Sequence, residues 1–194
     1  MTPAHEGHSP LTSAASMRVL AHPTRLTLLG LLRERGPQTA AQLGDIVDEA
    51  PGTVSYHLAK LASIDLIEPA EPQSADKRER WWKAAAPLTS WDMAELLDDP
   101  EKAAASWALQ KSIGQAYAAR FSDYIDAAPT MPREWIEAGA TGDRVLRLTA
   151  HELASLTTEV EALVTRYAET SAGRTDSDSD TAPVSVVYQA YRRP

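Results

Sequence analysis

Cysteine is absent from the 194 residues of the sequence. Disulfides, thiolate metal sites and cysteine nucleophiles are therefore excluded. No stretch approaches the ~20 apolar residues that a membrane-spanning helix needs. The opening residues, MTPAHEGHSPLTS, also lack the basic and apolar regions of a signal peptide. We therefore expect a cytoplasmic protein that makes no contact with a membrane.

The patterns that mark many enzymes are missing as well. The chain has no glycine-rich phosphate-binding loop, no set of metal ligands and no plausible catalytic triad. His5 and His8 have the spacing of a metal-binding pair, but two ligands in a flexible tail form a weak site. His151 and Glu152 fit a helix cap better than a catalytic pair. We predict that the protein is not an enzyme and has no catalytic residue, no bound metal and no cofactor.

The charge is distributed unevenly along the chain. The net charge is −8, but residues 15–86 contain nine basic and nine acidic residues and are neutral as a whole. Residues 87–194 contain ten basic and seventeen acidic residues, so the acidity lies mainly in the second half. Binding to phosphates depends on local clusters of cations. The overall charge therefore neither supports nor refutes binding to a nucleic acid.

The first half of the chain has the pattern of short helices followed by a hairpin. Helices are expected, in order, over residues 14–21, 24–35, a segment opened by Thr39, and 51–63. Strands are expected over residues 66–69 and 80–84. The run from Thr39 to Gln42 is a capping box, and Pro51 suits a first helical position. We therefore place one domain over residues 14–86, after a flexible tail over residues 1–13.

The second half of the chain is predicted to contain two longer helices. Asp99 and Pro100 suit an N-cap and a first helical position, and their helix should run to about Ala127. Its apolar residues occupy much of its circumference, so it needs two covering surfaces, such as its own domain and a second subunit. The run Thr149-Ala-His-Glu152 is another capping box, and it opens the second helix. Residues 145–148 and 184–191 alternate like strands and could pair with one another.

The helix over residues 51–63 has one side that suits a DNA groove. On a helical wheel Val54, Leu58 and Leu61 face the core. The side chains that point away or lie on the flanks are small, hydroxylated or basic, and they belong to Gly52, Thr53, Ser55, Tyr56, His57, Ala59 and Lys60. No carboxylate lies between Gly52 and Ser63. This side of the helix could therefore approach base edges and phosphates in a major groove.

The tip of the expected hairpin, Asp76-Lys-Arg-Glu-Arg80, is basic. It could place Lys77, Arg78 or Arg80 against the DNA backbone or in the minor groove. The alternative is a solvated hairpin in which these cations are simply interleaved with Asp76 and Glu79. We favour phosphate contact for Arg78.

Several runs taken together resemble a known family. They are Leu20-Ala-His-Pro-Thr-Arg-Leu26, Ala41-Gln-Leu43, Thr53-Val-Ser-Tyr-His-Leu-Ala-Lys-Leu61 and Ile64-Asp-Leu-Ile67. With a basic hairpin and aromatic residues after them, they resemble the winged helix-turn-helix of ArsR/SmtB-type regulators over residues 14–86. The resemblance implies a homodimer that binds a palindromic operator in double-stranded DNA, usually as a repressor released by an effector. It also makes the helix over 51–63 the reader, with contacts from Thr53, Ser55, Tyr56, His57 and Lys60. The residues themselves add Gly52 of the same helix and Lys77, Arg78 and Arg80 of the hairpin to the expected DNA-binding set.

The expected fold class is α+β and mainly helical, with an N-terminal winged helix-turn-helix, C-terminal helices and a small antiparallel sheet. Beyond the winged helix we expect a helical region for dimerisation and a possible effector over residues 87–169. A flexible linker over residues 170–183 and a C-terminal strand over residues 184–194 follow.

The sequence departs from the metal-sensing members of that family. Their thiolate pair has no counterpart in Ala41-Gln-Leu-Gly-Asp-Ile-Val47, and the expected helix over 99–127 contains no histidine. A small organic molecule is therefore the effector we consider. Five tryptophans could line its cavity, although aromatic residues at such positions are more often part of a core. They are Trp81, Trp82, Trp91, Trp107 and Trp135.

Two alternatives remain at this stage. His57 could be half-buried and bonded to its own backbone instead of contacting DNA. The whole domain could also be a protein-interaction module that keeps the winged-helix scaffold without binding DNA, since the first half of the chain is neutral and the second half acidic.

Overall fold

Local sequence signals place the first two helices. Ser13 Oγ accepts the backbone N–H of Ser16 at 3.0 Å and so caps α1 (Ala14–Leu20). α2 (Pro23–Arg35) has proline in its first turn and ends at Gly36, whose φ of 72° favours glycine. Both predicted helices are confirmed by the structure, a computed structural model that describes residues 8–74, 79–91, 96–174 and 180–193.

Helices α3 and α4 follow one another across a tight turn. α3 (Ala40–Val47) opens with the predicted capping box, in which Thr39 Oγ1 accepts the N–H of Gln42 while Gln42 Oε1 accepts the N–H of Thr39. The helix ends at Asp48 in the left-handed region, and α4 (Pro51–Ala62) begins shortly after it. A Cβ atom at Gly44 would lie 2.6 Å from the carbonyl oxygen of Glu49. The turn between the two helices therefore requires glycine at position 44.

A three-stranded antiparallel sheet lies beside these helices. Its order is β2-β4-β3, and its strands are β2 (Gln38–Thr39), β4 (Trp81–Ala84) and β3 (Ile67–Ala70). The pairing sets Ile67 opposite Ala84 and Thr39 opposite Trp81. The β3–β4 hairpin confirms the two predicted strands to within one residue. β2 was not predicted, because two residues are too few to show an alternating pattern.

A second, two-stranded sheet joins the start of the chain to the segment after the hairpin. β1 (His8–Pro10) pairs in parallel with β5 (Leu88–Ser90). This pairing contradicts the flexible tail that the sequence predicts over residues 1–13, because residues 8–10 of that segment form β1. Its hydrogen-bond partner lies far along the chain, and no local pattern reveals such a partner.

The core around these elements is formed by leucines of every helix from α1 to α4. Its fully buried apolar side chains are Met17, Leu20, Leu28, Leu32, Leu43, Val54, Leu58, Leu61, Leu66 and Leu109. Each of them stabilises the fold by about 1.5–3 kcal/mol relative to exposure in water. The last of them belongs to α6 (Pro100–Ala127), so the first part of that helix packs into the same core.

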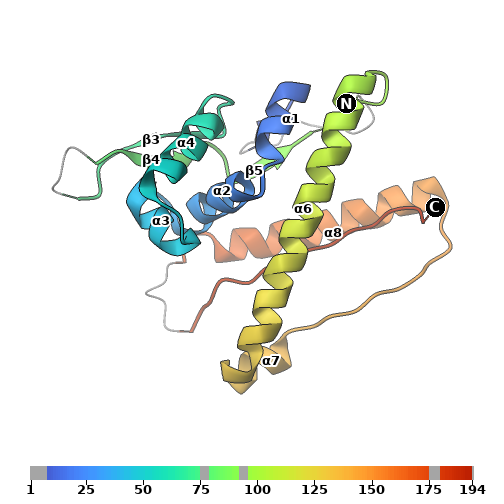
Figure 1. Ribbon diagram of the computed structural model, residues 1–194. Coiled ribbons are helices and arrows are strands. Elements are labelled where there is room, and N and C mark those ends of the chain that lie inside the picture. Colours follow the sequence, from blue (N-terminus) through green and yellow to red (C-terminus); the bar gives the residue numbers. More distant parts are fainter. Residues whose placement is uncertain (1–7, 75–78, 92–95, 175–179, 194) are drawn as a thin grey trace. The chain divides into compact units, whose positions relative to one another are not determined.

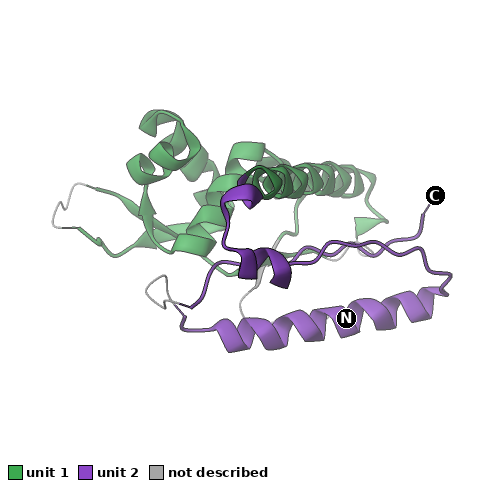
Figure 2. Ribbon diagram, turned by 90° about the horizontal axis from the view of Figure 1, so that it is seen from below, with its two compact units in different colours: residues 1–126 green, residues 127–194 purple. Residues whose placement is uncertain are grey.

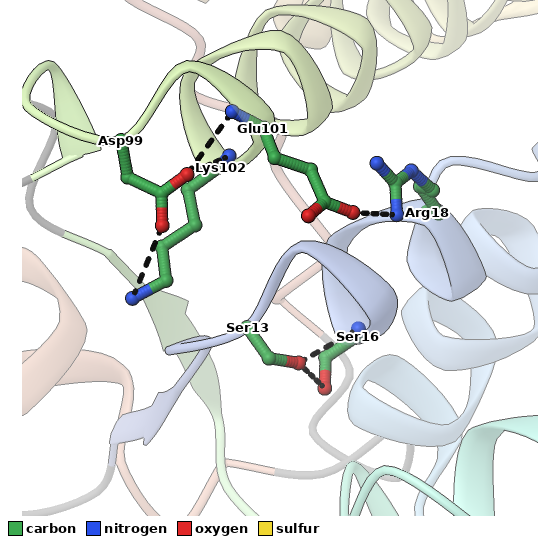
Figure 3. A network of polar contacts seen from close by, with 6 residues as sticks. All are labelled: Ser13, Ser16, Arg18, Asp99, Glu101 and Lys102. Atoms are coloured by element: carbon green, nitrogen blue, oxygen red, sulfur yellow. Dashed lines mark hydrogen bonds and ion pairs between the residues drawn. The ribbon is translucent and has the colours of Figure 1, made fainter.

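The start of α6 is fixed by the predicted N-cap (Figure 3). Asp99 Oδ1 accepts the backbone N–H of Glu101 at 3.0 Å and that of Lys102 at 3.1 Å. Glu101 also forms an ion pair with Arg18 of α1 at 2.8 Å. Both side chains of this pair are more than half exposed, so we expect it to contribute little to stability. The cap and the core therefore hold this end of α6 more than the ion pair does.

The expected apolar face of α6 is covered over only part of its length. Leu109 is fully buried and Ile113 packs against the core. Tyr117 and Phe121, further along the helix, are 38% and 48% exposed. The second covering surface that the sequence requires is therefore not provided by the described residues around this stretch.

Arg33 ties α2 to the segment that leads into β5. Its Nε donates to the carbonyl oxygen of Ala86 at 3.0 Å, and its Nη2 donates to Thr89 Oγ1 at 2.6 Å. Burial lowers the pKa of Arg33, and the nearby Tyr117 acts in the opposite direction. Sequence reasoning did not single out this arginine, because its partners lie more than fifty residues away.

The chain divides into two compact units, and the elements described so far belong to the first, apart from the last residue of α6. Unit 1 comprises Met1–Asp126 and unit 2 comprises Ala127–Pro194 (Figure 2). None of the helices among the described residues is long and apolar enough to cross a membrane.

The described residues of unit 2 form one long helix and two shorter elements. They are η1 (Ala128–Thr130), α7 (Arg133–Ala138) and α8 (Ala150–Ser171). Helix α8 opens with the predicted capping box, because Thr149 Oγ1 accepts the N–H of Glu152 and the Glu152 carboxylate accepts the N–H of Thr149. These bonds also lower the pKa of Glu152.

The strands expected in this unit are not formed. Residues 145–148 and 184–193 contain no strand, so the predictions of a strand over 145–148, of a C-terminal strand and of pairing between them were wrong for the single chain. The C-terminal segment instead runs along α8, where the Tyr188 hydroxyl donates to the Glu161 carboxylate (Figure 1). An alternating pattern shows which residues are apolar, but a strand forms only where a neighbouring strand accepts and donates its backbone hydrogen bonds.

Candidate nucleic-acid interface

Helix α4 is divided cleanly into a buried side and an exposed side. Val54, Leu58 and Leu61 are fully buried, as the helical wheel predicts. The exposed residues are Pro51, Gly52, Thr53, Ser55, Tyr56, Ala59 and Lys60. Tyr56 is the largest of them, with 57% of its surface exposed. Val54, Leu58 and Leu61 therefore anchor the helix in the core, and its exposed side carries no carboxylate.

His57 does not belong to the exposed surface of α4. The sequence pattern predicts a flank position with a DNA contact, or a half-buried position as the alternative, but only 7% of the surface of His57 is exposed. Its ring lies 4.7 Å from the ring of His22 and 5.3 Å from that of Tyr56. His57 Nδ1 is buried and has no hydrogen-bond partner among the described residues. In this structure His57 is a core residue of the helix-helix contact.

Arg25 of α2 lies close to these aromatic rings. Its Nε is buried and has no hydrogen-bond partner within the described part of the chain. Burial lowers the pKa of Arg25, and the nearby Tyr56 raises it. The pKa of His57 is lowered, first by burial and then by the charges of His22 and Arg25, while Glu49 raises it. A neutral His57 is therefore the favoured state.

Two cations project beside the exposed side of α4. Lys60 Nζ lies 5.6 Å from the centre of the Tyr56 ring, close enough for a cation–π contact. Arg80 is exposed, and its guanidinium lies 4.1 Å from the ring of the buried Trp82. Because the stacking limits the freedom of the guanidinium, Arg80 presents a positioned charge at the base of the hairpin. Lys77 and Arg78, the other predicted wing contacts, lie outside the described residues.

A groove connects α4 to the hairpin. Its volume is about 350 Å³, and it is lined by Thr39, Ala40, Ala41, Ser55, Ala59, Glu79, Arg80 and Trp82. Three of these residues, at the start of α3, were assigned by sequence reasoning only to a helix cap or to the family resemblance. Glu79 is the acidic residue among those that line the groove, and the Ser74 hydroxyl donates a hydrogen bond to its carboxylate at 2.5 Å. The groove brings the starts of α3 and β4 next to the exposed side of α4.

The arrangement of α3, α4 and the hairpin agrees with a match to a known protein family. A family profile described as a helix-turn-helix domain matches residues 20–70. Within the matched residues, α3 and α4 are arranged as a helix-turn-helix pair, and the β3–β4 hairpin, whose second strand lies beyond residue 70, stands beside them as the wing. The winged helix-turn-helix that the sequence resemblance implies, and the fold class built on it, are thereby confirmed.

Several solved structures are similar to the chain at low TM-scores. A possible transcriptional regulator for arsenical resistance is 27% identical, with 51% of this chain and 83% of that chain covered and a TM-score of 0.32. An apo mutant of ZitR from Lactococcus lactis is 16% identical, with 76% and 83% covered and a TM-score of 0.33. Disulfide-formed AbfR is 18% identical, with 66% and 73% covered and a TM-score of 0.27. No curated protein gave a significant match.

The five tryptophans considered for an effector cavity belong to different segments of the chain, all after residue 70. Trp81 and Trp82 are both buried, and Trp91 packs against the core. Trp107 of α6 is 47% exposed, and Trp135 belongs to unit 2. Of these five, Trp82 lines the groove beside α4. The Nε1 of Trp81 is buried without a hydrogen-bond partner among the described residues.

Proposed function

We propose that this chain is a transcription regulator that binds double-stranded DNA by inserting α4 into the major groove. The observation that carries the proposal is the composition of the exposed side of α4, where small, hydroxyl and basic side chains stand free of carboxylates. Hydroxyls and Lys60 can donate to base edges or phosphates there. The buried anchors on the other side of the helix fix the orientation of this surface.

The proposed contacts follow from exposure. From α4 they are Gly52, Thr53, Ser55, Tyr56 and Lys60. From the wing, Arg80 is positioned by Trp82 to meet a phosphate beside the groove. Lys77 and Arg78 remain proposed contacts on sequence grounds alone. His57 is left out of this set because its ring is buried.

We further propose that two copies act together on a palindromic operator. One α4 helix reads only a few base pairs, so a pair of such helices set about one DNA turn apart, ~34 Å, gives a longer and more specific site. Repression is the proposed outcome of binding, and a small, non-metal molecule that changes the spacing of the two helices would release the protein. Such an effector and the DNA would then be coupled reciprocally.

The test is selection of bound fragments from genomic DNA by the purified full-length protein at physiological salt. We expect recovered fragments to share a sequence with two inverted half-sites. Retention must resist an excess of nonspecific competitor DNA, because phosphate contacts alone give sequence-independent binding. If no fragment is retained, DNA binding is wrong, and the alternative of a winged-helix protein-interaction module takes its place. Fragments with a single half-site would contradict only the dimeric arrangement.

A further inference from the structure

Unit 2 lacks the buried side chains that stabilise a folded segment. Among its described residues, none falls in the buried class, and α8 is a helix of 22 residues without one buried residue. Helices in proteins owe most of their stability to the packing of an apolar face. A surface outside the described unit must therefore cover α8 if unit 2 is to be stable.

The backbone of unit 2 also lacks partners. Residues 144–148 and 184–193 have neither turn nor bend, and no backbone hydrogen bond between described residues involves them. The first of these segments precedes α8 in the sequence and the second follows it, and both run as extended ribbons (Figure 1). An extended segment with free N–H and C=O groups is an edge to which another strand can add.

The side chains of these segments and of α8 are apolar and exposed. The largest of them are between 43% and 70% exposed, and they are Val145, Leu146, Leu148, Leu163, Tyr167, Val184, Val186, Val187, Tyr188 and Tyr191. A standard stable interface buries ~800 Å² per partner, with apolar side chains at its centre. Ten large, exposed apolar side chains in one unit can form the centre of such an interface.

The charges favour a second copy over other partners. Residues 184–191 contain no charged side chain, and Arg144, Arg147 and Arg192 flank the apolar positions of the two segments. Helix α8 is acidic, with Glu152, Glu159, Glu161 and Glu169 against a single arginine. Basic segments and an acidic helix in one unit complement the same features of an identical unit, and the acidic helix disfavours a nucleic acid.

We propose that unit 2 is a dimerisation module in which residues 144–148 and 184–191 pair with those of a second copy to form an intermolecular β-sheet over α8. Two identical edges related by a twofold axis satisfy one another, as an isologous interface requires. Both segments alternate like strands but have no neighbouring strand in the single chain, and the second copy would supply it. The inference rests on the proposed function only for its use of two copies, since the dimer should form without DNA.

The experiment is sedimentation equilibrium of the full-length protein without DNA, combined with amide hydrogen exchange. We expect twice the mass of the chain, and slow exchange over residues 184–191 that becomes fast when the protein is diluted to monomers. The Val186→Asp variant should weaken self-association by about tenfold or more, because the interface would have to bury an unpaired charge. Ser185→Asp, which adds the same charge at a position that is already polar, is the matched control and should dimerise nearly as the parent does.

Three outcomes would overturn the inference. They are a monomer at all accessible concentrations, a dimer whose residues 184–191 exchange freely, and equal effects of the two aspartate variants. The exchange result is read on the parent protein, so it stands even if Val186→Asp does not fold. Failure of the proposed function looks different, because a protein that dimerises through unit 2 but retains no genomic fragment would contradict DNA binding and leave this interface in place.

Discussion

The ring of His22, at the junction of α1 and α2, lies 4.7 Å from the buried ring of His57 on α4. Burial and the charge of Arg25 lower the pKa of His22, and burial, His22 and Arg25 lower that of His57. Glu49 opposes the shift of His57. A proton added to either ring would thus meet other positive charge on the buried side of α4.

Stability should therefore fall on mild acidification. In the unfolded chain histidine titrates near its ordinary pKa of 6.5, while both rings titrate lower in the folded chain. Below about pH 6.5 the unfolded state binds more protons than the folded state, so the free energy of unfolding decreases as the pH drops toward the folded-state pKa values. Urea unfolding at a series of pH values measures this slope.

Two histidine variants locate the source of that slope. His57→Gln should flatten the pH dependence of the free energy of unfolding, because the buried group no longer titrates. His151→Gln, which changes an exposed histidine at the start of α8, is the control and should leave the slope of unit 1 unchanged. A slope that survives in His57→Gln and His22→Gln alike would assign the effect to other groups.

The turn between α3 and α4 should reject any side chain at Gly44. The Cβ of Gly44→Ala would meet the carbonyl oxygen of Glu49 at 2.6 Å, so the backbone must shift. We expect a loss of about 1–3 kcal/mol in the free energy of unfolding, as for other overpacked sites. Gly114→Ala on α6, where nothing lies within 4 Å of the added Cβ, should instead gain about 0.5–1 kcal/mol. Similar effects of the two variants would contradict the clash.

Lys60 and Arg80 should each account for part of the salt dependence of DNA binding. A cation that contacts one phosphate contributes about 0.9 to the slope of log affinity against log salt concentration. Lys60→Ala and Arg80→Ala should each lower the slope by about one ion per subunit. Lys111→Ala, an exposed lysine of α6, is the matched control. Fluorescence anisotropy of a labelled duplex over a range of salt gives the slopes, and an unchanged slope removes that residue from the phosphate contacts.

Tyr188 reports whether the C-terminal segment lies on α8 in solution. Its hydrogen bond to Glu161, with burial as a smaller cause, raises the pKa of Tyr188 to about 12. The neutral hydroxyl is favoured in the folded state, so this contribution to stability is lost as the pH rises from the ordinary value near 10 toward 12. Glu161→Ala should move one tyrosine back toward a pKa near 10 in an ultraviolet titration, and Glu159→Ala should not.

The sequence predicted the parts of the fold that local signals determine. The capping boxes at Thr39 and Thr149, the N-cap at Asp99 and the buried stripe of α4 are all present in the structure. These features depend on residues three or four positions apart, so they can be recognised in a single sequence.

What the sequence did not reveal depends on partners distant along the chain. The pairing of β1 with β5 and the two hydrogen bonds of Arg33 join residues that are far apart in sequence. His57 was misplaced for a related reason. A helical wheel puts it on a flank, and the packing of His22, from the junction of α1 and α2, against that flank cannot be seen in the sequence of α4 alone. The prediction of strands in unit 2 was wrong because alternating residues do not show whether a neighbouring strand is present.

The division of α4 into anchors and free positions has an evolutionary consequence. Val54, Leu58 and Leu61 carry the packing, while an added Cβ at Gly52 would meet nothing within 4 Å. Exposed substitutions on such a surface usually change stability by less than about 0.5 kcal/mol. Under the proposed function, descendants of this chain can therefore exchange Gly52, Thr53 or Ser55 and acquire preferences for new base sequences without first having to repair the scaffold.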